Sequence, residues 1–525
     1  MANLIVNVKL WDKNVGALMW DKDKGVASFQ YDDKFIRSGL DISPIVMPLN
    51  KSSKNQVYQF LGNRNDCFKG LPGLIADSLP DKYGTQIIKE WFTSQGLANE
   101  EITPLDQLCY IGKRGMGALE FEPDKSIKGL DKSSLLHMEE LTKLADSIFK
   151  DRKSFQEKLI QQDKHILDII KVGTSAGGAK PKAIITLNEN TGEIRSGQVK
   201  APEGFTYWLL KFDGTTYSEH NNNMKNPKGI GNIEYTYYRM AIDAGINMME
   251  SRLLTEGDSH HFMTKRYDRL DNGDKIHVQT LAALTHMNRD SRHSYEEAFA
   301  SMRTLKMGYP QFEEFYRRMV FNVITRNHDD HTKNHCFLMN REGKWSLSPA
   351  YDLCYSYTPG GQWTDKHQMS LNGKVDEFTF SDLEKVGILV GINHPNQIIE
   401  KTVDIASKWK EYAKDNGVRE SHIKQINENL LLLSQRKIYS ISNKKEYEFQ
   451  EAIKTNGFTR IIGLKDEGYI PSPKIIDELK GSAPTPMMIA VQKIFGLPSD
   501  TPGLSNIKLA QSDSKELGLN IEKGI

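Results

Sequence analysis

The stretch Asn327-His-Asp-Asp-His-Thr-Lys-Asn334 places eight polar or charged residues directly after an apolar helical pattern and just before an apolar strand pattern. Because loops anchored between buried elements commonly carry functional groups, this position favours a functional loop. The alternative is a helix cap followed by a turn, which Asp, Asn and His residues also form. The preceding helix is predicted from seven apolar residues on one face: Phe312, Phe315, Tyr316, Met319, Val320, Val323 and Ile324.

The chain after this loop predicts that a second acid lies beside it. Apolar residues 336–339 and the segment 344–347 flank the turn Asn340-Arg-Glu-Gly343, which is the pattern of a β-hairpin. The second strand leads to Ser348-Pro-Ala-Tyr-Asp352. The hairpin is therefore expected to bring Asp352 close to the loop that carries Asp329.

Two carboxylates and an amide in this arrangement suit phosphoryl transfer. That reaction needs a carboxylate to orient the attacking hydroxyl, and oxygen ligands that hold Mg²⁺ on the phosphates of ATP. In the kinase motif HRDxxxxN the Asn follows the Asp by five positions. Asn334 follows Asp329 by five positions and Asp330 by only four, so the spacing favours Asp329 as the base. The predicted catalytic residues are Asp329, His331 and Lys333, and the predicted metal ligands are Asn334 and Asp352.

Two further signals concern phosphate binding. Residues 173–182 are rich in small side chains, which let backbone N–H groups approach phosphates. The stretch is not a Walker A loop, because Ala179 stands where that motif requires Lys, and alone it favours a plain turn. Lys211 lies in the apolar strand pattern 207–212, where it either reaches solvent or points inward at a phosphate. Glu234 is a candidate ion partner for Lys211.

Length and composition set the broad class of the protein. A chain of 525 residues predicts two or three domains. The 69 basic residues nearly balance the 68 acidic ones, so we expect neither sequence-specific DNA binding nor a membrane surface as the main partner. Four scattered cysteines without a CxxC pair argue against a disulfide framework or a zinc site. The first residues lack a signal-peptide pattern and no apolar run reaches membrane-span length, so we expect a cytoplasmic protein.

The predicted fold class is α+β. Alternating residues in 1–60 predict a small antiparallel sheet, and the second half of the chain is predicted to be helical as far as residue 327. Helices are expected at 86–95, 137–150, 155–171 and 232–244, the last with Asn232 as its N-cap. The predicted domains are 1–125, 126–440 and a C-terminal extension of unknown role at 441–525.

The order of these segments resembles the HipA family of serine/threonine kinase toxins over most of residues 1–440. The segments that carry the resemblance are GLPGLIADSLPDKYG, YIGKRGMGALEF, VGTSAGGAKPKA, YWLLKFDG, TKRYDR, RNHDDHTKNHCF and LSPAYDLCYS. NHDDHTKN followed by SPAYD is the most specific of them. The resemblance implies a bilobal kinase-like fold, with an α/β N-terminal portion and a mostly helical C-terminal lobe. It also implies ATP and Mg²⁺ as cofactors, a protein substrate such as an aminoacyl-tRNA synthetase, and a small helix-turn-helix antitoxin of HipB type.

The resemblance also implies site residues beyond the polar loop. Ser175, or the adjacent Thr174, matches the loop position whose autophosphorylation silences family members. Lys265, Arg266 and Tyr267 match the hinge that holds the nucleotide base. The ATP-binding residues implied in this way are Gly177, Gly178, Ala179, Lys180, Pro181, Lys182, Lys211, Lys265, Arg266, Tyr267, His331, Lys333, Asn334, Tyr351 and Asp352.

Two alternatives to a kinase are consistent with parts of the sequence. The cluster from His328 to His331 also resembles a metal-dependent phosphohydrolase site, in which His and Asp side chains hold a divalent ion. The further ligands of such a site would come from His165, His260, His261, His286 or His293. The second alternative is a pseudokinase that acts as a binding module or as an antitoxin-linked regulator, although no required residue is missing.

Overall fold

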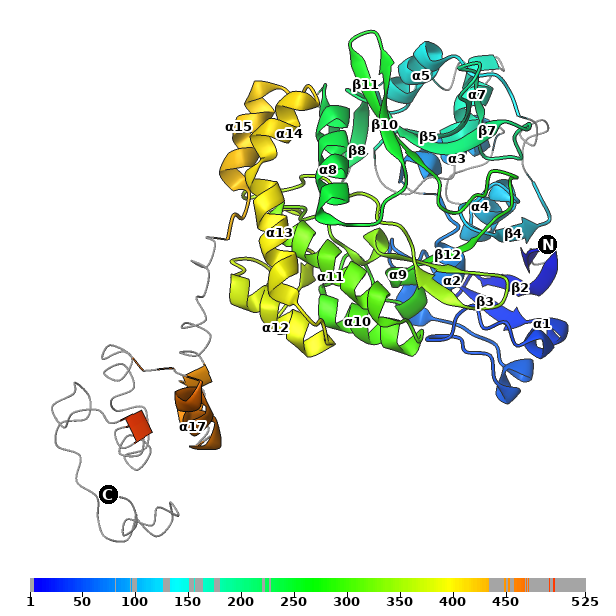
Figure 1. The fold of residues 1–525 in the computed structure, drawn as a ribbon. Coiled ribbons are helices and arrows are strands. Elements are labelled where there is room, and N and C mark those ends of the chain that lie inside the picture. The colour runs from blue at the N-terminus through cyan, green and yellow to red at the C-terminus, as the bar shows by residue number, and fades with distance from the viewer. Residues whose placement is uncertain are drawn as a thin grey trace. The chain divides into compact units, whose positions relative to one another are not determined.

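The structure is a computed structural model (Figure 1). It describes residues 4–433 except 81, 95, 97–101, 126–132, 151–154, 156–163, 174–179, 220–221 and 226–227, and beyond Leu433 only residues 448–449, 452–453, 458–467, 469, 471, 491 and 494–495. The chain divides into two units, Met1–Leu433 and Ser434–Ile525. In the second unit helix α17 spans Phe458–Asp466. No helix among the described residues is long and apolar enough to cross a bilayer.

The N-terminal residues form the predicted antiparallel sheet, because alternate side chains face one core. On β1 the side chains of Val6, Val8 and Leu10 are fully buried. The strands are β1 (Ile5–Leu10), β2 (Lys13–Asp21), β3 (Val26–Tyr31) and β4 (Leu119–Glu122), in the order β3-β2-β1-β4. Between β3 and β4 lie α1 (Asp33–Ser38), η1 (Lys51–Asn55), η2 (Leu61–Arg64), α2 (Gly73–Ala76), α3 (Lys82–Ser94) and α4 (Pro104–Ile111).

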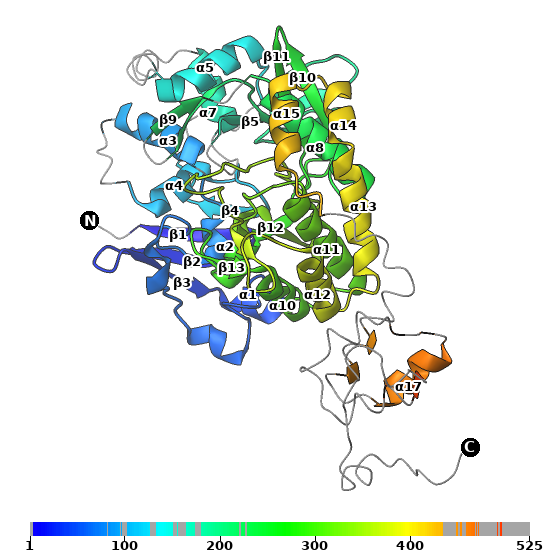
Figure 2. The same cartoon turned by 90° about the vertical axis from the view of Figure 1, so that its left-hand side faces the viewer.

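A second, five-stranded antiparallel sheet lies at the opposite end of this unit from helices α10 and α12 (Figures 1 and 2). Its order is β10-β11-β7-β5-β6, and α5, α7 and α3 share a hydrophobic core with it. Only the second half of the predicted helix 155–171 coincides with α7, and most of the first half lies outside the described residues. The elements are α5 (Met138–Lys150), α7 (Lys164–Gly173), β5 (Lys182–Asn188), β6 (Ile194–Ser196), β7 (Phe205–Lys211), the hairpin β8 (Thr216–Glu219) and β9 (Asn222–Lys225), β10 (Ser251–Glu256) and β11 (Ser259–Lys265).

The rest of the first unit is mostly helical, as predicted. All seven apolar residues predicted for one face of α11 are buried in its core. The helices are α8 (Ile230–Ala244), α9 (Leu281–Thr285), α10 (Tyr295–Thr304), α11 (Tyr309–Ile324), α12 (Phe380–Val390), α13 (Pro395–Ser407), α14 (Trp409–Asp415) and α15 (Glu420–Asn429). The strands are β12 (His277–Thr280), β14 (Cys336–Met339) and β15 (Trp345–Leu347), which form one sheet, and β13 (His293–Ser294) and β16 (Met369–Ser370), which form another.

The N-cap predicted for α8 is wrong. The helix begins earlier, after Gly229, whose φ of 91° is a left-handed conformation that glycine adopts without strain. The carboxylate of Asp213 accepts hydrogen bonds from the backbone N–H groups of Gly229 (2.8 Å) and Ile230 (3.1 Å). Asn232 lies inside the helix and its amide donates to the carbonyl of Asn416 (2.8 Å). An acid distant in the sequence thus supplies the cap, which local sequence patterns do not reveal.

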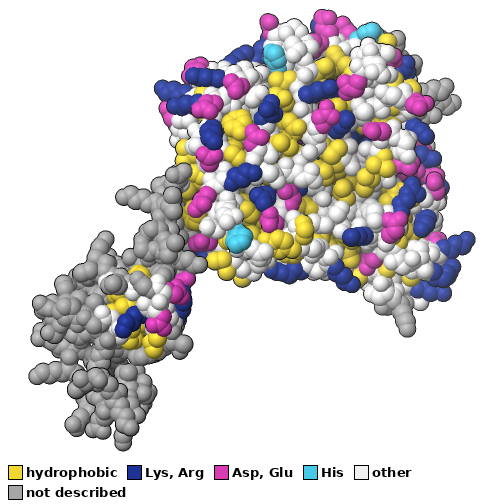
Figure 3. Space-filling view, in the orientation of Figure 1, with side chains coloured by type: hydrophobic (Ala, Val, Ile, Leu, Met, Phe, Trp, Pro, Cys, Tyr) yellow, Lys and Arg dark blue, Asp and Glu magenta, His cyan; other side chains and the backbone are white. Residues whose placement is uncertain are grey.

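The α+β class is confirmed by this combination of small antiparallel sheets and a helical lobe. Acidic and basic side chains are interspersed over the face drawn in Figure 3, in keeping with the near-zero net charge. The polar stretch 327–334 connects the end of α11 to the start of β14, so two buried elements hold it from both sides.

Candidate active site

The polar loop is tied to the segment that follows Asp352. The side-chain amide of Asn327 donates to the backbone carbonyl of Asp352 (3.2 Å), and the backbone N–H of Asp329 donates to Ser356 Oγ (2.9 Å). Ser356 Oγ in turn donates to Asn327 Oδ1 (2.8 Å). The predicted closeness of the loop and Asp352 is confirmed, because the β14–β15 hairpin returns the chain to the loop.

Within the loop, three predicted functional side chains lie together. The amide nitrogen of Asn334 donates to the backbone carbonyl of Asp329 (2.7 Å), an orientation that leaves the carboxamide oxygen as the acceptor atom of this side chain. His331 Nε2 lies 3.6 Å from Asp329 Oδ1. The Asp329 side chain is 54% exposed, so its carboxylate is accessible to an incoming hydroxyl group. Asn334, five residues after Asp329 in the sequence, ends the η4 turn (Thr332–Asn334), which brings it back to the side of the loop where Asp329 lies.

Lys211, Glu234 and Asp352 form a cluster of ion pairs at the end of β7. The ammonium of Lys211 donates to both carboxylates, which confirms Glu234 of α8 as its ion partner. Burial alone would raise the pKa of Asp352, but the positive charges of Lys211 and Lys182 lower it to about 2. Burial likewise opposes the charge on Lys211, yet the two carboxylates hold its pKa above the ordinary value. Asp352 and Lys211 are therefore both charged at neutral pH.

The backbone at Asp352 is itself unusual. Its φ of 53° lies in the left-handed region, where Asp is tolerated better than bulky residues because its short side chain is polar. Strained positions of this kind persist where the surrounding structure holds them, and they cluster at functional sites. The bond from Asn327 to the Asp352 carbonyl is one such restraint.

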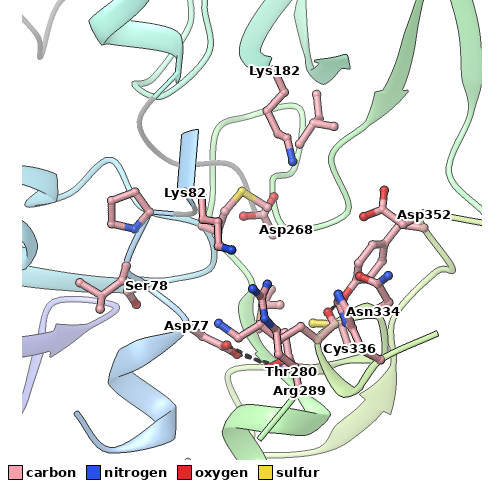
Figure 4. A pocket seen from close by; sticks show the side chains of 18 of the residues that line it. Asp77, Ser78, Lys82, Lys182, Asp268, Thr280, Arg289, Asn334, Cys336 and Asp352 are labelled. Atoms are coloured by element: carbon pink, nitrogen blue, oxygen red, sulfur yellow. Dashed lines mark hydrogen bonds between the residues drawn. The ribbon is translucent and has the colours of Figure 1, made fainter. Parts of the chain in front are cut away.

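A cavity of about 700 Å³ joins these groups and reaches from the five-stranded sheet to the polar loop (Figure 4). This volume falls within the range of small-molecule and cofactor sites. The Lys182 side chain points into the cavity from β5, and Asn334 and Asp352 lie together on another side of it. The predicted site residues that line it are Asp329, Lys182, Lys211, Lys265, Arg266, Tyr267, His331, Lys333, Asn334, Tyr351 and Asp352.

The predicted phosphate loop is placed only in part. Gly177, Gly178 and Ala179 lie outside the described residues, as do Ser175 and Thr174. Lys180 is exposed, and Pro181 is buried with its carbonyl accepting from the N–H of Phe212 (3.2 Å). Neither Lys180 nor Pro181 lines the cavity. Among the described residues of this loop, Lys182 is the one whose side chain enters it.

Two of the three predicted hinge side chains form ion pairs within the protein: Lys265 Nζ lies 2.9 Å from Glu250 Oε2, and Arg266 pairs with Asp268. The guanidinium of Arg266 forms two hydrogen bonds with the buried carboxylate of Asp268 (2.8 and 2.6 Å). Burial would raise the pKa of Asp268, but Arg266 and Arg269 hold it well below the usual range. The Tyr267 ring stacks on Tyr351 with centroids 5.8 Å apart. The charge of Arg266 is therefore neutralised within the protein.

One wall of the cavity was not predicted from the sequence. It comes from residues near α2 and α3, and it includes Cys67, Asp77 and Lys82 together with Arg289. Lys333 Nζ donates to the backbone carbonyl of Cys67 (3.2 Å), so this side chain reaches toward that wall. Asp77 accepts from the N–H and hydroxyl of Thr280 (2.7 and 3.0 Å). The sequence signal that could have indicated this wall is segment 70–84, which is interrupted by several Gly and Pro residues, because such turns bring distant backbone into a site.

The four side chains from His328 to His331 diverge. His328 is fully buried and stacks on Tyr357 and His367, with ring centroids 4.7 and 4.1 Å away. Asp330 is also buried and hydrogen-bonded inward, whereas Asp329 and His331 line the cavity. Among the described residues no three His, Cys, Asp or Glu side chains converge as a metal site would require. This geometry gives no support to the phosphohydrolase alternative.

Comparison with known proteins identifies the architecture. The HipA N-terminal domain matches residues 6–122, and the HipA-like C-terminal domain matches residues 174–412. HipA of Shewanella oneidensis MR-1, solved with HipB and operator DNA, aligns with a TM-score of 0.52 and 16% identity, over 82% of this chain and 96% of that chain. The Helicobacter pylori proinflammatory kinase CtkA aligns with a TM-score of 0.29 and 14% identity, over 45% of this chain and 89% of that chain. No curated protein matches the chain.

The two matched domains lie in the same order as in the sequence-based interpretation, and together they span more than half of the residues. The first matched domain contains the four-stranded sheet, and the second contains the five-stranded sheet and most of the helical lobe. Residues of both domains line the cavity. The chain belongs to the HipA family.

Proposed function

We propose that the protein is an ATP- and Mg²⁺-dependent serine/threonine kinase of the HipA toxin type. The observation that carries the proposal is that Lys211, Asp352, Asn334 and Asp329 all line one cavity of nucleotide size. These are the residue types that phosphoryl transfer requires: a cation for the phosphates, oxygen ligands for the metal and a carboxylate for the acceptor hydroxyl.

The donor atoms fit magnesium. Asn334 offers a carboxamide oxygen, and the low pKa of Asp352 keeps a carboxylate available at neutral pH. Mg²⁺ prefers such oxygen ligands and commonly binds through one or two of them together with the phosphates of the substrate. When bound, the ion neutralises charge on the transferred phosphoryl group. Asn334 and Asp352 would hold it.

The roles of the remaining residues follow from their positions. Lys211 would contact the nucleotide phosphates, with Glu234 holding its ammonium in place. Asp329 would orient the acceptor hydroxyl and accept its proton, because its carboxylate is exposed at the cavity. His331, whose Nε2 lies 3.6 Å from Asp329 Oδ1, would contact the transferred phosphoryl group. Tyr267 and Tyr351 contribute a flat, apolar surface at the nucleotide end.

Partners and regulation are proposed from family membership. The acceptor would be a serine or threonine of a cellular protein, with an aminoacyl-tRNA synthetase as the first candidate. A HipB-type antitoxin is the proposed partner, since the Shewanella oneidensis HipA was solved with HipB. Autophosphorylation at Ser175 would add negative charge to a phosphate-binding loop and so disfavour ATP binding.

The test is transfer of labelled phosphate from ATP in the presence and absence of Mg²⁺. The wild-type protein should form phosphoprotein only with Mg²⁺, and Asp329→Asn should lower the rate by at least about 100-fold. Asp415→Asn, an exposed acid on α14 that does not line the cavity, is the matched control and should retain wild-type activity. Release of free phosphate without any phosphoprotein would contradict the kinase and favour a hydrolase.

A further inference from the structure

Asp330, the acid next to the proposed base, has no role in the chemistry described above, yet its carboxylate is completely buried. It accepts hydrogen bonds from the hydroxyl of Tyr295 (2.7 Å) and from Nδ1 of His367 (2.9 Å). The backbone N–H groups of Gln368 (2.8 Å) and Met369 (3.3 Å) also donate to it. A buried carboxylate is costly unless its oxygens are satisfied in this way.

Three of these four donors belong to the segment 367–369, which lies beyond Asp352 in the chain and comes before α12. Gln368 of this segment lines the cavity together with Asp329. Trp363, four residues before the segment, lines the cavity as well. The Gln368 side-chain amide donates to the backbone carbonyl of Trp363, which ties the two cavity-facing residues to each other. Asp330 thus joins this segment to the loop that carries the proposed base.

The attachment continues into the helical core. Tyr295, on α10, accepts at its hydroxyl from the amide of Asn322 on α11 (3.1 Å). Asn322 accepts from the amide of Asn327 (2.9 Å), and Asn327 donates to the carbonyl of Asp352. One chain of buried hydrogen bonds therefore connects the segment, two helices, the polar loop and Asp352. Buried hydrogen-bond networks of this kind hold a site in one geometry.

The location of the segment indicates what it faces. The phosphate- and base-binding candidates Lys182, Lys211 and Lys265 come from the five-stranded sheet. Trp363 and Gln368 instead belong to the helical lobe. The backbone N–H of Gln368 donates to Asp330, which is the residue next to Asp329. The acceptor hydroxyl has to reach Asp329, so the chain bearing it would lie against this side of the cavity.

We propose that Asp330 is a positioning residue that holds residues 363–369 against the polar loop, and that Trp363 and Gln368 form the wall on which the acceptor polypeptide lies. This inference rests on the proposed kinase function for its second half. The amide nitrogen of Gln368 donates to the backbone carbonyls of Trp363 and Lys366, which leaves its carboxamide oxygen to accept from a backbone N–H. This oxygen and the aromatic ring of Trp363, which packs on side chains, suit an extended peptide segment.

The first measurement does not depend on kinase activity. Hydrogen–deuterium exchange of the full chain should show faster exchange over residues 363–369 in Asp330→Asn, because an amide cannot accept all four bonds. The control is Asp382→Asn, another buried acid with several hydrogen bonds, which caps α12 and does not line the cavity. If residues 363–369 exchange equally fast in both variants, Asp330 does not position the segment.

The second measurement separates acceptor from nucleotide. With a serine peptide selected from a degenerate library by the wild-type kinase, Trp363→Ala should raise the peptide KM about tenfold and leave the ATP KM within about twofold. Trp363→Phe retains an aromatic ring, so its peptide KM should lie close to the wild-type value. An ATP KM that rises in parallel, or a peptide KM unchanged in Trp363→Ala, would overturn the acceptor wall. If no peptide is phosphorylated by the wild type, the kinase proposal itself fails, and the exchange result still decides the role of Asp330.

Discussion

The ammonium of Lys211 donates to the carboxylate of Asp352, which lies 141 positions further along the chain. Lys211 also donates to the carboxylate of Glu234, so one ammonium pairs with two carboxylates. Under the proposed function, the phosphates of ATP would contact Lys211 and Mg²⁺ would bind Asp352.

Removing the charge of Lys211 should lower both activity and stability. In Lys211→Met, the carboxylates of Glu234 and Asp352 lose the ammonium that both of them contact, and the free energy of unfolding should fall by about 2–4 kcal/mol. Phosphoryl transfer should fall at least about 100-fold. The double variant Lys211→Met/Asp352→Asn should regain part of the stability, because one negative charge is gone, but none of the activity. Urea unfolding and labelled-phosphate transfer measure the two effects; additive losses of stability would show that the pair is not coupled.

The second prediction concerns the metal. Asp352→Asn removes the charge of the proposed metal ligand, so the affinity for a non-hydrolysable ATP analogue should fall about tenfold or more in the presence of Mg²⁺. Without Mg²⁺ the variant and the wild type should differ much less. Calorimetric titration at several Mg²⁺ concentrations measures this difference. An affinity that depends on Mg²⁺ equally in both proteins would remove Asp352 from the proposed metal site. Asp415→Asn, an exposed acid on α14 that does not line the cavity, serves as the control.

The third prediction concerns pH. Burial, reinforced by the nearby charges of His367 and Arg326, lowers the pKa of His328 to about 3. The neutral ring therefore contributes stability that is fully present above its ordinary pKa of 6.5 and is lost as the pH falls from there toward 3. Lowering the pH from about 7.5 to about 5 should therefore reduce the free energy of unfolding of the wild type by roughly 1–2 kcal/mol through this residue.

The variant His328→Phe isolates this contribution. The ring of Phe retains the stacking on Tyr357 and His367 but does not titrate. Urea unfolding of wild type and variant at both pH values gives the difference, and the variant should lose less stability on acidification. An identical loss in both proteins would show that His328 is not the group that titrates.

The fourth prediction tests the cap of α8, which carries Glu234. Asp213→Ala removes the acceptor for the N–H groups of Gly229 and Ile230 and should lower the stability by about 1–2 kcal/mol. Asp213→Asn keeps an oxygen acceptor and should lose less. Because the cap orients the start of α8, the Ala variant should also weaken nucleotide binding through Glu234 and Lys211. A stability equal to the wild type would show that the cap has no energetic role.

The polar loop and its neighbours were predictable because their signals are local. The helical period of α11, the hairpin after the loop and the five-residue spacing from Asp329 to Asn334 can all be read within 45 residues. The pairing of Lys211 with Glu234 was also predictable as a candidate, because a lysine in an apolar strand needs a partner. The cap of α8 was not predictable, since Asp213 lies 16 positions before the N–H group that it binds.

By itself the sequence determined the elements and the chemical groups of this protein: alternating and helical periods set the strands and helices, and the polar loop supplied an acid, an amide and a histidine. Tertiary structure alone decided which groups share the cavity, why Asp330 is buried while Asp329 is exposed, and that Lys333 reaches Cys67. The physical reason is that neighbouring loop residues carry the same local preferences, whereas burial and hydrogen-bond partners come from segments far away in the chain.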